Sequence, residues 1–300
     1  MLASGVLGVT ADSMAQVVRS GAGGVTTKSL WAREHAGHPG PVIIAGEHFM
    51  LNAVGIPDAG PEKAREEIAH YREVCKAPLI ANIVGGSISD YAEIAGVVAD
   101  FAPDIIEVNI SCPNVSDEFG KPMACSIVKA AEVTALVKKV LLDKGSRVPV
   151  TVKLSPNVEN IVAIADSVLK AGADGITAIN TLGPGMVIDI DFARPVLANK
   201  VGGLSGPGMK PIAVKMVHDI YKAGKDGKIG CPIIGTGGVM TGRDAIEMMM
   251  AGATLVGVGS AVWFRGQDVF GKIVSEMNEW CESAGVAHLR DVIGKVHAAN

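Results

Sequence analysis

The sequence predicts a single (β/α)8 barrel domain over residues 1–300, and three observations support this fold class. The length suits an α/β barrel, which commonly fills about 250 residues as one domain. The composition, with 48% apolar and only 4% aromatic residues, suits parallel strands buried on both faces beneath covering helices. Short β-branched runs also alternate with amphipathic helical patterns along the chain, as repeated β/α units require.

Eight apolar runs are predicted to be the barrel strands, and most of them precede a helical pattern. In chain order these runs are residues 1–5, 24–28, 78–84, 104–111, 148–154, 175–181, 232–236 and 254–259. The helical period is clearest in the segment that begins at Ile161, where Ile161, Ile164, Val168 and Leu169 share one stripe.

Glycines mark the predicted ends of helices. The segments 20–23, 171–174 and 251–254 each place a Gly-Ala pair between a helix and the next strand, where glycine accepts a left-handed backbone. Two stretches, 31–61 and 183–210, are longer than ordinary connections. Long ordered loops after barrel strands are typical places for catalytic chemistry, so we expect these stretches to border the site.

Composition also excludes several classes of protein. The net charge of −4 is spread along the chain, which argues against nucleic-acid binding and against an anionic membrane surface. No apolar run reaches the roughly 18 residues of a membrane span, and the N-terminus lacks a signal-peptide pattern, so we expect a cytoplasmic protein. Five cysteines without a CxxC pair predict neither a disulfide framework nor a metal or iron–sulfur site.

The strongest local signal is the segment 109–114, Asn-Ile-Ser-Cys-Pro-Asn, at the end of a predicted strand. An isolated cysteine here would more often be a packed small residue. Cys112, however, is followed by a rigid proline and flanked by the carboxamides of Asn109 and Asn114, which favours a catalytic role over the barrel mouth. Cys125, in the loop that follows, is the second candidate for the catalytic base. For Cys75, Cys231 and Cys281 we expect small-hydrophobe packing.

A phosphate site is predicted after the last two strands. Gly237 and Gly238 follow the seventh predicted strand, and Gly259 and Ser260 follow the eighth. Many barrels bind phosphate at this place through backbone N–H groups. Residues 241–244, Thr-Gly-Arg-Asp, read as a capping box that begins the next helix. This pattern suits any phosphate-bearing ligand equally well.

The segment 109–114 resembles the active-site loop of the class 1 dihydroorotate dehydrogenases, and other motifs match in the same chain order. They lie at residues 3–5, 27–29, 50–56, 81–82, 152–154, 179–181, 202–207, 235–239 and 257–260. The resemblance spans nearly the whole chain and is closest to class 1B. Two departures are a start at Met1 inside the expected first strand, and Ser260 where relatives often carry threonine.

The resemblance implies an FMN-dependent enzyme of de novo pyrimidine biosynthesis that oxidises (S)-dihydroorotate to orotate. Cys112 would remove the C5 proton as a thiolate, and FMN would accept the hydride from C6, so activity should rise as the thiol loses its proton. The implied cofactor-binding residues are Ser4, Lys28, Ser29, Asn82, Asn109, Lys153, Ile179, Gly206, Gly237, Gly238, Gly259 and Ser260. The implied substrate-binding residues are Lys28, Asn52, Ala53, Val54, Gly55, Ile56, Asn109, Asn114, Asn180 and Thr181.

These assignments make chemical sense. Carboxamides both donate and accept hydrogen bonds, as the ring carbonyls and N–H groups of orotate require. Lys28 would lie near the flavin and the substrate carboxylate. Lys153 would lie near the N1 and O2 edge of the flavin, where a fixed cation favours the reduced ring.

The route of the electrons depends on the class. The chain has no GxGxxG after a strand for a dinucleotide and no cysteine cluster for an iron–sulfur centre. Residues 202–215 resemble class 1B, which implies a homodimer with a partner subunit that carries FAD and an iron–sulfur cluster and reduces NAD. Four alternatives stay open: a fumarate-using class 1A enzyme, a dihydropyrimidine dehydrogenase-like flavoenzyme, a flavin-free isomerase or aldolase that binds a sugar phosphate, and a barrel that binds a partner without catalysis.

Overall fold

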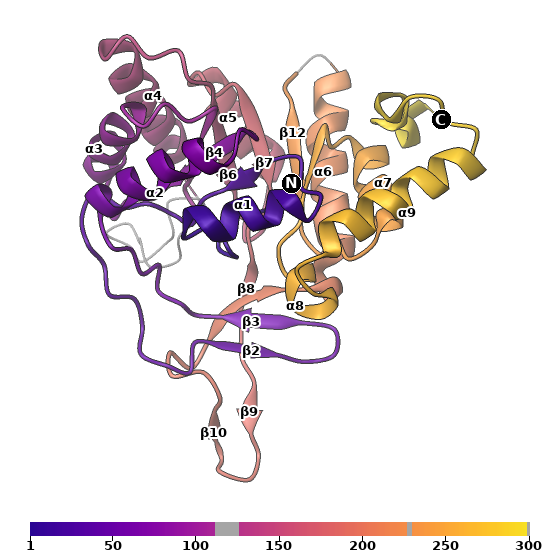
Figure 1. The fold of residues 1–300 in the computed structure, drawn as a ribbon, viewed down its shortest axis with the longest axis horizontal. Coiled ribbons are helices and arrows are strands. Elements are labelled where there is room, and N and C mark those ends of the chain that lie inside the picture. The colour runs from indigo at the N-terminus through magenta and orange to yellow at the C-terminus, as the bar shows by residue number, and fades with distance from the viewer. Residues whose placement is uncertain (112–125, 227–229, 299–300) are drawn as a thin grey trace.

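The computed structural model of the chain describes residues 1–111, 126–226 and 230–298. Its centre is a seven-stranded sheet in the order β1-β4-β5-β6-β7-β12-β13, in which every neighbouring pair is parallel (Figure 1). These strands are β1 (Val25–Thr26), β4 (Leu79–Ile83), β5 (Ile105–Asn109), β6 (Val150–Leu154), β7 (Gly175–Ala178), β12 (Ile233–Thr236) and β13 (Leu255–Gly257). All seven lie within the runs predicted from the sequence.

The residues around Leu2 close this sheet into a barrel. Leu2 forms a parallel bridge with Val258, next to β13, and its N–H donates to the Gly24 carbonyl at 3.0 Å. The N–H of Thr26, on β1, donates to the Leu2 carbonyl at 3.2 Å. The segment therefore lies between β13 and β1 as the eighth strand, and the predicted (β/α)8 barrel is confirmed.

Helices cover the outside of the barrel (Figure 1). They are α1 (Ala11–Arg19), α2 (Pro61–Val74), α3 (Ile88–Ala99), α4 (Ile127–Asp143), α5 (Ile161–Lys170), α6 (Lys210–Lys225), α7 (Gly242–Ala251), α8 (Ala261–Arg265) and α9 (Val269–Ser283), with 3-10 turns η2 (Pro207–Met209), η3 (Leu289–Val292) and η4 (Lys295–Ala298). The predicted stripe of α5 faces the core through Ile161, Ile164 and Val168. The predicted glycine stops also hold, because Gly21 and Gly172 have φ values of 103° and 104°.

The two long stretches contain strands and form a second, antiparallel sheet in the order β2-β3-β11-β8. Its strands are β2 (Ile43–Ala45), β3 (Met50–Asn52), β8 (Leu182–Gly185) and β11 (Gly202–Ser205). A hairpin, β9 (Ile188–Asp189) with β10 (Arg194–Pro195), extends from it. Figure 1 shows this sheet and hairpin projecting from one end of the barrel. We name residues 186–195, which contain the hairpin, the arm.

The two faces of the barrel strands differ in character. Side chains that point outward, such as Ile106 and Val152, join one large apolar cluster with the helices. Buried polar side chains point inward, because Lys153 on β6 reaches Ser4 on the opposite side of the barrel at 2.9 Å. The barrel interior is therefore polar at this level, unlike the branched apolar layers of many barrels. No helix that the described residues form is long and apolar enough to cross a membrane.

Candidate active site

Every one of the eight barrel strands ends in a residue that the sequence assigned to the site. Because parallel strands end at the same rim of a barrel, these residues surround one opening. In strand order they are Ser4 after the Leu2 strand, Lys28 and Ser29 after β1, Asn82 on β4, Asn109 on β5, Lys153 on β6, Ile179, Asn180 and Thr181 after β7, Gly237 and Gly238 after β12, and Gly259 and Ser260 after β13.

Asn109 joins three of these positions through its carboxamide. Its Nδ2 donates to Ser29 Oγ at 3.3 Å, and its Oδ1 accepts from Asn180 Nδ2 at 3.1 Å and from the Ser111 N–H at 3.2 Å. The structure thus brings together residues that follow β1, β5 and β7. This cluster presents donors and acceptors of the kind that a flat heterocycle with carbonyl and N–H groups requires.

Lys153 supplies a buried positive charge. The residue is 5% exposed, and its ammonium donates to the neutral hydroxyl of Ser4 at 2.9 Å. Within the described ranges no carboxylate forms an ion pair with it. A buried ammonium without a counter-ion is costly. The site therefore suits an anionic or strongly polar ligand.

Lys28 and Asp58 form a second charged region beside the rim. Burial lowers the pKa of the half-buried Lys28 ammonium, and the negative charge of Asp58 opposes that shift. Burial also raises the pKa of Asp58, while hydrogen bonds from backbone N–H groups oppose that change. One of these bonds, from the Trp31 N–H, is 2.6 Å long. Asp58 thereby fixes the chain that follows Lys28.

The predicted substrate segment 52–56 begins at Asn52, the last residue of β3 on the second sheet. Asn52 Nδ2 donates to the Gly203 carbonyl at 3.4 Å, and a Cβ placed on Gly203 would overlap the Thr181 side chain. Asn52 and Thr181 are thus brought against the same glycine. Ala53, Val54, Gly55 and Ile56 follow, and the His38 N–H donates to the Val54 carbonyl at 3.1 Å. No described hydrogen bond joins this segment to Asn109 or Asn180.

Gly206 brings the second sheet close to the start of α6. It adopts a φ of +94°, and a Cβ there would lie 3.0 Å from the Cα of Phe49 and 3.2 Å from the N of Met50. Only glycine combines this backbone conformation with such a close approach. The structure therefore shows two protein segments in close approach at Gly206.

The two glycine segments of the predicted phosphate site are held by charged side chains. The capping box is confirmed, because Asp244 accepts from the Thr241 N–H at 2.8 Å and Thr241 Oγ1 accepts from the Asp244 N–H at 3.2 Å. Lys210 at the start of α6 donates to Asp244 at 2.7 Å. These bonds fix the segment that contains Gly237 and Gly238 against α6.

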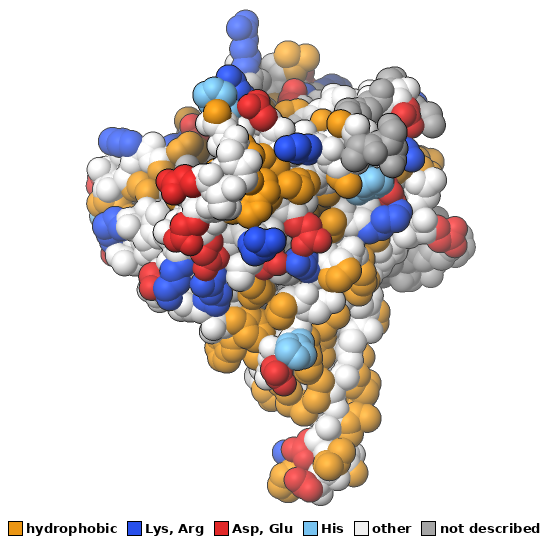
Figure 2. Space-filling view, turned by 90° about the vertical axis from the view of Figure 1, so that its right-hand side faces the viewer, with side chains coloured by type: hydrophobic (Ala, Val, Ile, Leu, Met, Phe, Trp, Pro, Cys, Tyr) orange, Lys and Arg blue, Asp and Glu red, His pale blue; other side chains and the backbone are white. Residues whose placement is uncertain are grey.

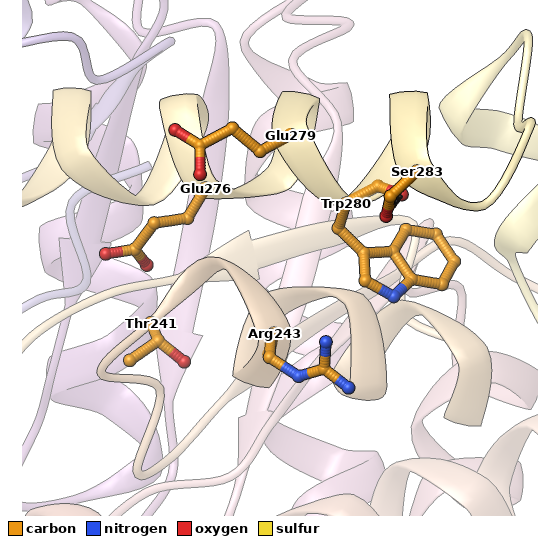
Figure 3. A pocket seen from close by; sticks show the side chains of 6 residues that line it. All are labelled: Thr241, Arg243, Glu276, Glu279, Trp280 and Ser283. Atoms are coloured by element: carbon orange, nitrogen blue, oxygen red, sulfur yellow. Dashed lines mark hydrogen bonds between the residues drawn. The ribbon is translucent and has the colours of Figure 1, made fainter.

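Arg265 links this segment to the one after β13. Its guanidinium donates to the Met240 carbonyl at 2.7 Å and to Glu276 at 2.6 Å, while Glu276 accepts from the Gly242 N–H at 2.5 Å. Arg265 ends α8, which begins directly after Ser260. Figure 3 shows Glu276 on α9 reaching toward the start of α7.

A surface hollow of about 380 Å³ lies beside this link, between α7 and α9 (Figure 3). It is lined by Thr241, Arg243, Glu276, Glu279, Trp280 and Ser283. No residue that the sequence assigned to the cofactor or the substrate lines this hollow. The hollow is therefore separate from the rim that gathers those residues.

Three residues with a predicted role in the site lie outside the described residues. They are Cys112, Asn114 and the second candidate for the base, Cys125. The other cysteines are part of the packing. Cys75 and Cys231 pack against the main apolar cluster, and Cys281 packs against a smaller one. Burial raises the pKa of the Cys231 thiol to about 11. These three thiols fit the packing role that the sequence predicted.

Sequence reasoning missed Glu107 and Thr177, which lie in the barrel interior below the rim. Glu107 is 2% exposed and accepts from Asn82 Nδ2 and from Thr177 Oγ1, each at 2.6 Å. A signal was present, because Glu107 is an acidic residue inside the apolar strand Ile-Ile-Glu-Val-Asn. Such a residue is rarely buried without a specific partner.

Comparisons with known proteins agree with this arrangement. Residues 1–280 match the family model described as dihydroorotate dehydrogenase. The catalytic subunit of dihydroorotate dehydrogenase B (NAD(+)) from Methanothermobacter thermautotrophicus is 40% identical over 297 residues, which cover 99% of this chain and 94% of that protein. The corresponding subunit from Geobacillus kaustophilus is 41% identical over 275 residues, covering 91% and 83%.

A solved structure is also similar. The crystal structure of dihydroorotate dehydrogenase from Eimeria tenella in complex with ferulenol superposes with a TM-score of 0.83 at 25% identity. The match covers 99% of this chain and 84% of that one. With the family model matched over most of the chain and relatives near 40% identity, the chain belongs to the dihydroorotate dehydrogenase family and is similar to catalytic subunits of its class 1B.

Proposed function

We propose that the chain is the catalytic subunit of a dihydroorotate dehydrogenase that oxidises (S)-dihydroorotate to orotate in de novo pyrimidine biosynthesis. The observation that carries this proposal is the cluster of Asn109, Asn180 and Ser29 beside the cations of Lys28 and Lys153, at the mouth of a barrel of this family. The carboxamides suit the ring carbonyls and N–H groups of the substrate. A cation at the rim suits its carboxylate.

We propose FMN as the cofactor, and three observations support the fit. The buried Oδ1 of Asn82 has no partner among the described groups, which suits a ligand that brings a donor. Lys153 has no counter-ion among the described residues, and its charge suits an electron-accepting ring. The glycine segments at Gly237 and Gly259 suit a phosphate. FMN, when bound, supplies an acceptor for a hydride from C6.

The chain itself would bind and orient the substrate and move one proton. Asn109 and Asn180 would hold the pyrimidine ring, and Lys28 would face the carboxylate. Cys112 would remove the C5 proton as a thiolate, and Asn114 follows it two positions later in the sequence. Because C5 would lose a proton to the base and C6 would lose a hydride to the cofactor, the base and the cofactor must lie on opposite faces of the ring.

The electrons would leave through a partner. The relatives named above are catalytic subunits of an NAD(+)-linked enzyme, which supports a separate electron-transfer subunit for this chain. We propose that this partner carries FAD and an iron–sulfur cluster and reduces NAD. Fumarate is the competing acceptor, as in class 1A enzymes.

We also propose that the catalytic subunit forms a homodimer. The arm supports this, because Met186, Ile188, Ile190 and Phe192 are 49%, 56%, 87% and 69% exposed. Figure 2 shows apolar side chains gathered on the part of the molecule that projects from the barrel. Exposed apolar surface on this scale is typical of an interaction site. Light scattering of the purified chain tests the dimer.

The test of the main proposal is optical. The purified protein should show a flavin absorption spectrum that dihydroorotate bleaches within one turnover, and denaturation should release the colour. A colourless protein that cannot be reconstituted with FMN would favour a flavin-free barrel for a sugar phosphate. Bleaching by dihydrouracil but not by dihydroorotate would favour a dihydropyrimidine dehydrogenase. Rapid reoxidation by fumarate would assign class 1A, and rapid reoxidation by NAD without another subunit would contradict both classes.

A further inference from the structure

Asn82 has an incomplete set of hydrogen bonds in the barrel interior. The residue is fully buried, its N–H donates to Thr27 Oγ1 at 3.0 Å, and its carbonyl accepts from the Leu30 N–H at 2.9 Å. Its side-chain Nδ2 donates to Glu107 at 2.6 Å, but no described group donates to its Oδ1. A buried acceptor without a donor destabilises the protein unless a ligand supplies the donor. Asn109, by comparison, has protein partners on both ends of its carboxamide.

Glu107 decides which end of the Asn82 carboxamide faces it. Its Oε2 accepts from Thr177 Oγ1 at 2.6 Å and its Oε1 accepts from Asn82 Nδ2, so both oxygens act as acceptors. If the Asn82 carboxamide turned over, Oδ1 would meet Oε1 and two acceptors would face each other without a proton between them. Glu107 is 2% exposed, so bulk water does not compete for these bonds.

We propose that Glu107 is a positioning residue of the cofactor site, which fixes the Asn82 carboxamide with its oxygen free to accept a hydrogen bond from the flavin. This inference rests on the proposed FMN cofactor and adds a residue to which neither the sequence nor the family resemblance gave a role. Glu107 holds Asn82 in one of its two orientations, and Asn82 makes the contact. Thr177 anchors the second oxygen of Glu107 and has no part in orienting Asn82.

Two substitutions at Glu107 separate hydrogen bonding from charge. In Glu107→Met the acceptor is lost at similar volume, so the carboxamide of Asn82 is free to turn and to present a donor to the flavin. We expect the dissociation constant of FMN to rise at least about tenfold, which corresponds to about 1.4 kcal/mol for the mismatched buried hydrogen bond. In Glu107→Gln the oxygen can still accept from Asn82 while the new amide donates to Thr177. FMN affinity should then stay within about threefold of wild type.

Thr177→Val is the matched control. It removes one hydrogen bond from the same buried carboxylate and leaves the bond between Glu107 and Asn82 in place. FMN affinity should again stay within about threefold, even if the thermal midpoint falls as far as in Glu107→Met. The measurement is FMN fluorescence on serial dilution of each holoenzyme, with the flavin absorption spectrum recorded alongside.

Several outcomes would overturn the inference. It is wrong if Glu107→Gln releases FMN as readily as Glu107→Met, because the charge would then be the active feature. It is also wrong if Thr177→Val matches Glu107→Met, because the effect would then be structural, or if Glu107→Met retains FMN fully. If Glu107→Met does not fold, Glu107→Leu, which also lacks an acceptor, replaces it in these comparisons. Release of FMN beyond about threefold by Glu107→Gln overturns the inference on its own. A wild-type protein without FMN would refute the proposed function, whereas failure of the variants alone would refute only this inference.

Discussion

Gly238→Ala tests whether the glycine segment after β12 is constrained as the structure indicates. Gly238 has a φ of +71°, and an added Cβ would lie 2.6 Å from the Cβ and 2.7 Å from the Cα and N of Lys210. Two of these atoms are backbone at the start of α6, and Lys210 is held by its bond to Asp244. The overlap cannot be relieved by rotating a side chain, so α6 or the glycine segment must move.

Gly145→Ala supplies the reference for this substitution. Gly145 has a φ of +70°, nearly equal to that of Gly238, and a Cβ there would meet nothing within 4 Å. The control should therefore cost only the left-handed backbone penalty of about 1 to 2 kcal/mol. Gly238→Ala should cost that amount plus an overpacking term of about 1 to 3 kcal/mol. Its total of about 2 to 5 kcal/mol should exceed the control clearly.

The free energy of unfolding is measured by urea titration with circular dichroism, with and without excess FMN. We expect Gly238→Ala, but not Gly145→Ala, also to weaken FMN retention, because the displaced segment contributes to the proposed phosphate site. Equal destabilisation of the two variants within about 0.5 kcal/mol, together with unchanged FMN retention, would refute the reasoning.

Three further predictions follow from charged and titrating groups. Arg265→Met removes the link from α8 to the Met240 carbonyl and should weaken FMN binding about three- to tenfold in a fluorescence titration. Lys170→Met, which removes only an exposed pair with Asp166 on α5, should leave FMN binding unchanged. Because burial lowers the pKa of Lys28, its charge is lost at a lower pH than in an exposed lysine. In a Cys112→Ser background, the dissociation constant of orotate should therefore rise with alkaline pH, and Lys28→Arg should abolish that rise. A dissociation constant that does not change with pH while Lys28 is present would contradict the assignment of Lys28 to the substrate carboxylate. With a pKa of about 11, the Cys231 thiol should be about one part in a thousand thiolate at pH 8 and should be alkylated more slowly than an ordinary exposed cysteine, as peptide mass spectrometry would show.

The barrel could be predicted because its signals are local. Each strand of the seven-stranded sheet carries β-branched residues. Helix stops such as Gly172 adopt a positive φ, which glycine itself permits without any distant contact. The second sheet gave no such signal. Its strands are three or four residues long, Ile43 on β2 is 47% exposed, and the partner of Asn52 is Gly203, 151 positions further along the chain. Pairing between short, distant strands is set by tertiary contacts that local pattern does not contain.

For the candidate site, the sequence supplied residue types and strand ends but not the bonds between them. That Asn109 and Asn180 would meet followed from the common rim of parallel strands. That Arg265 would link the two glycine segments did not follow, because the bond depends on how α8 turns after Ser260. The assignments to Cys112 and Asn114 remain predictions.

The alternation within the buried strands holds information that the sequence analysis did not use. In β5, Ile106 and Val108 face the helices, whereas Glu107 and Asn109 face the interior. The same division recurs on β6, where Val150 and Val152 alternate with Thr151 and Lys153. In a strand covered on both sides, polar residues at every second position cannot be facing solvent. They must face a ligand or one another, so this pattern in adjacent strands marks the floor of a polar site. Stability then comes mainly from the apolar layer between strands and helices. The side chains that face the interior are available to bind and orient a ligand.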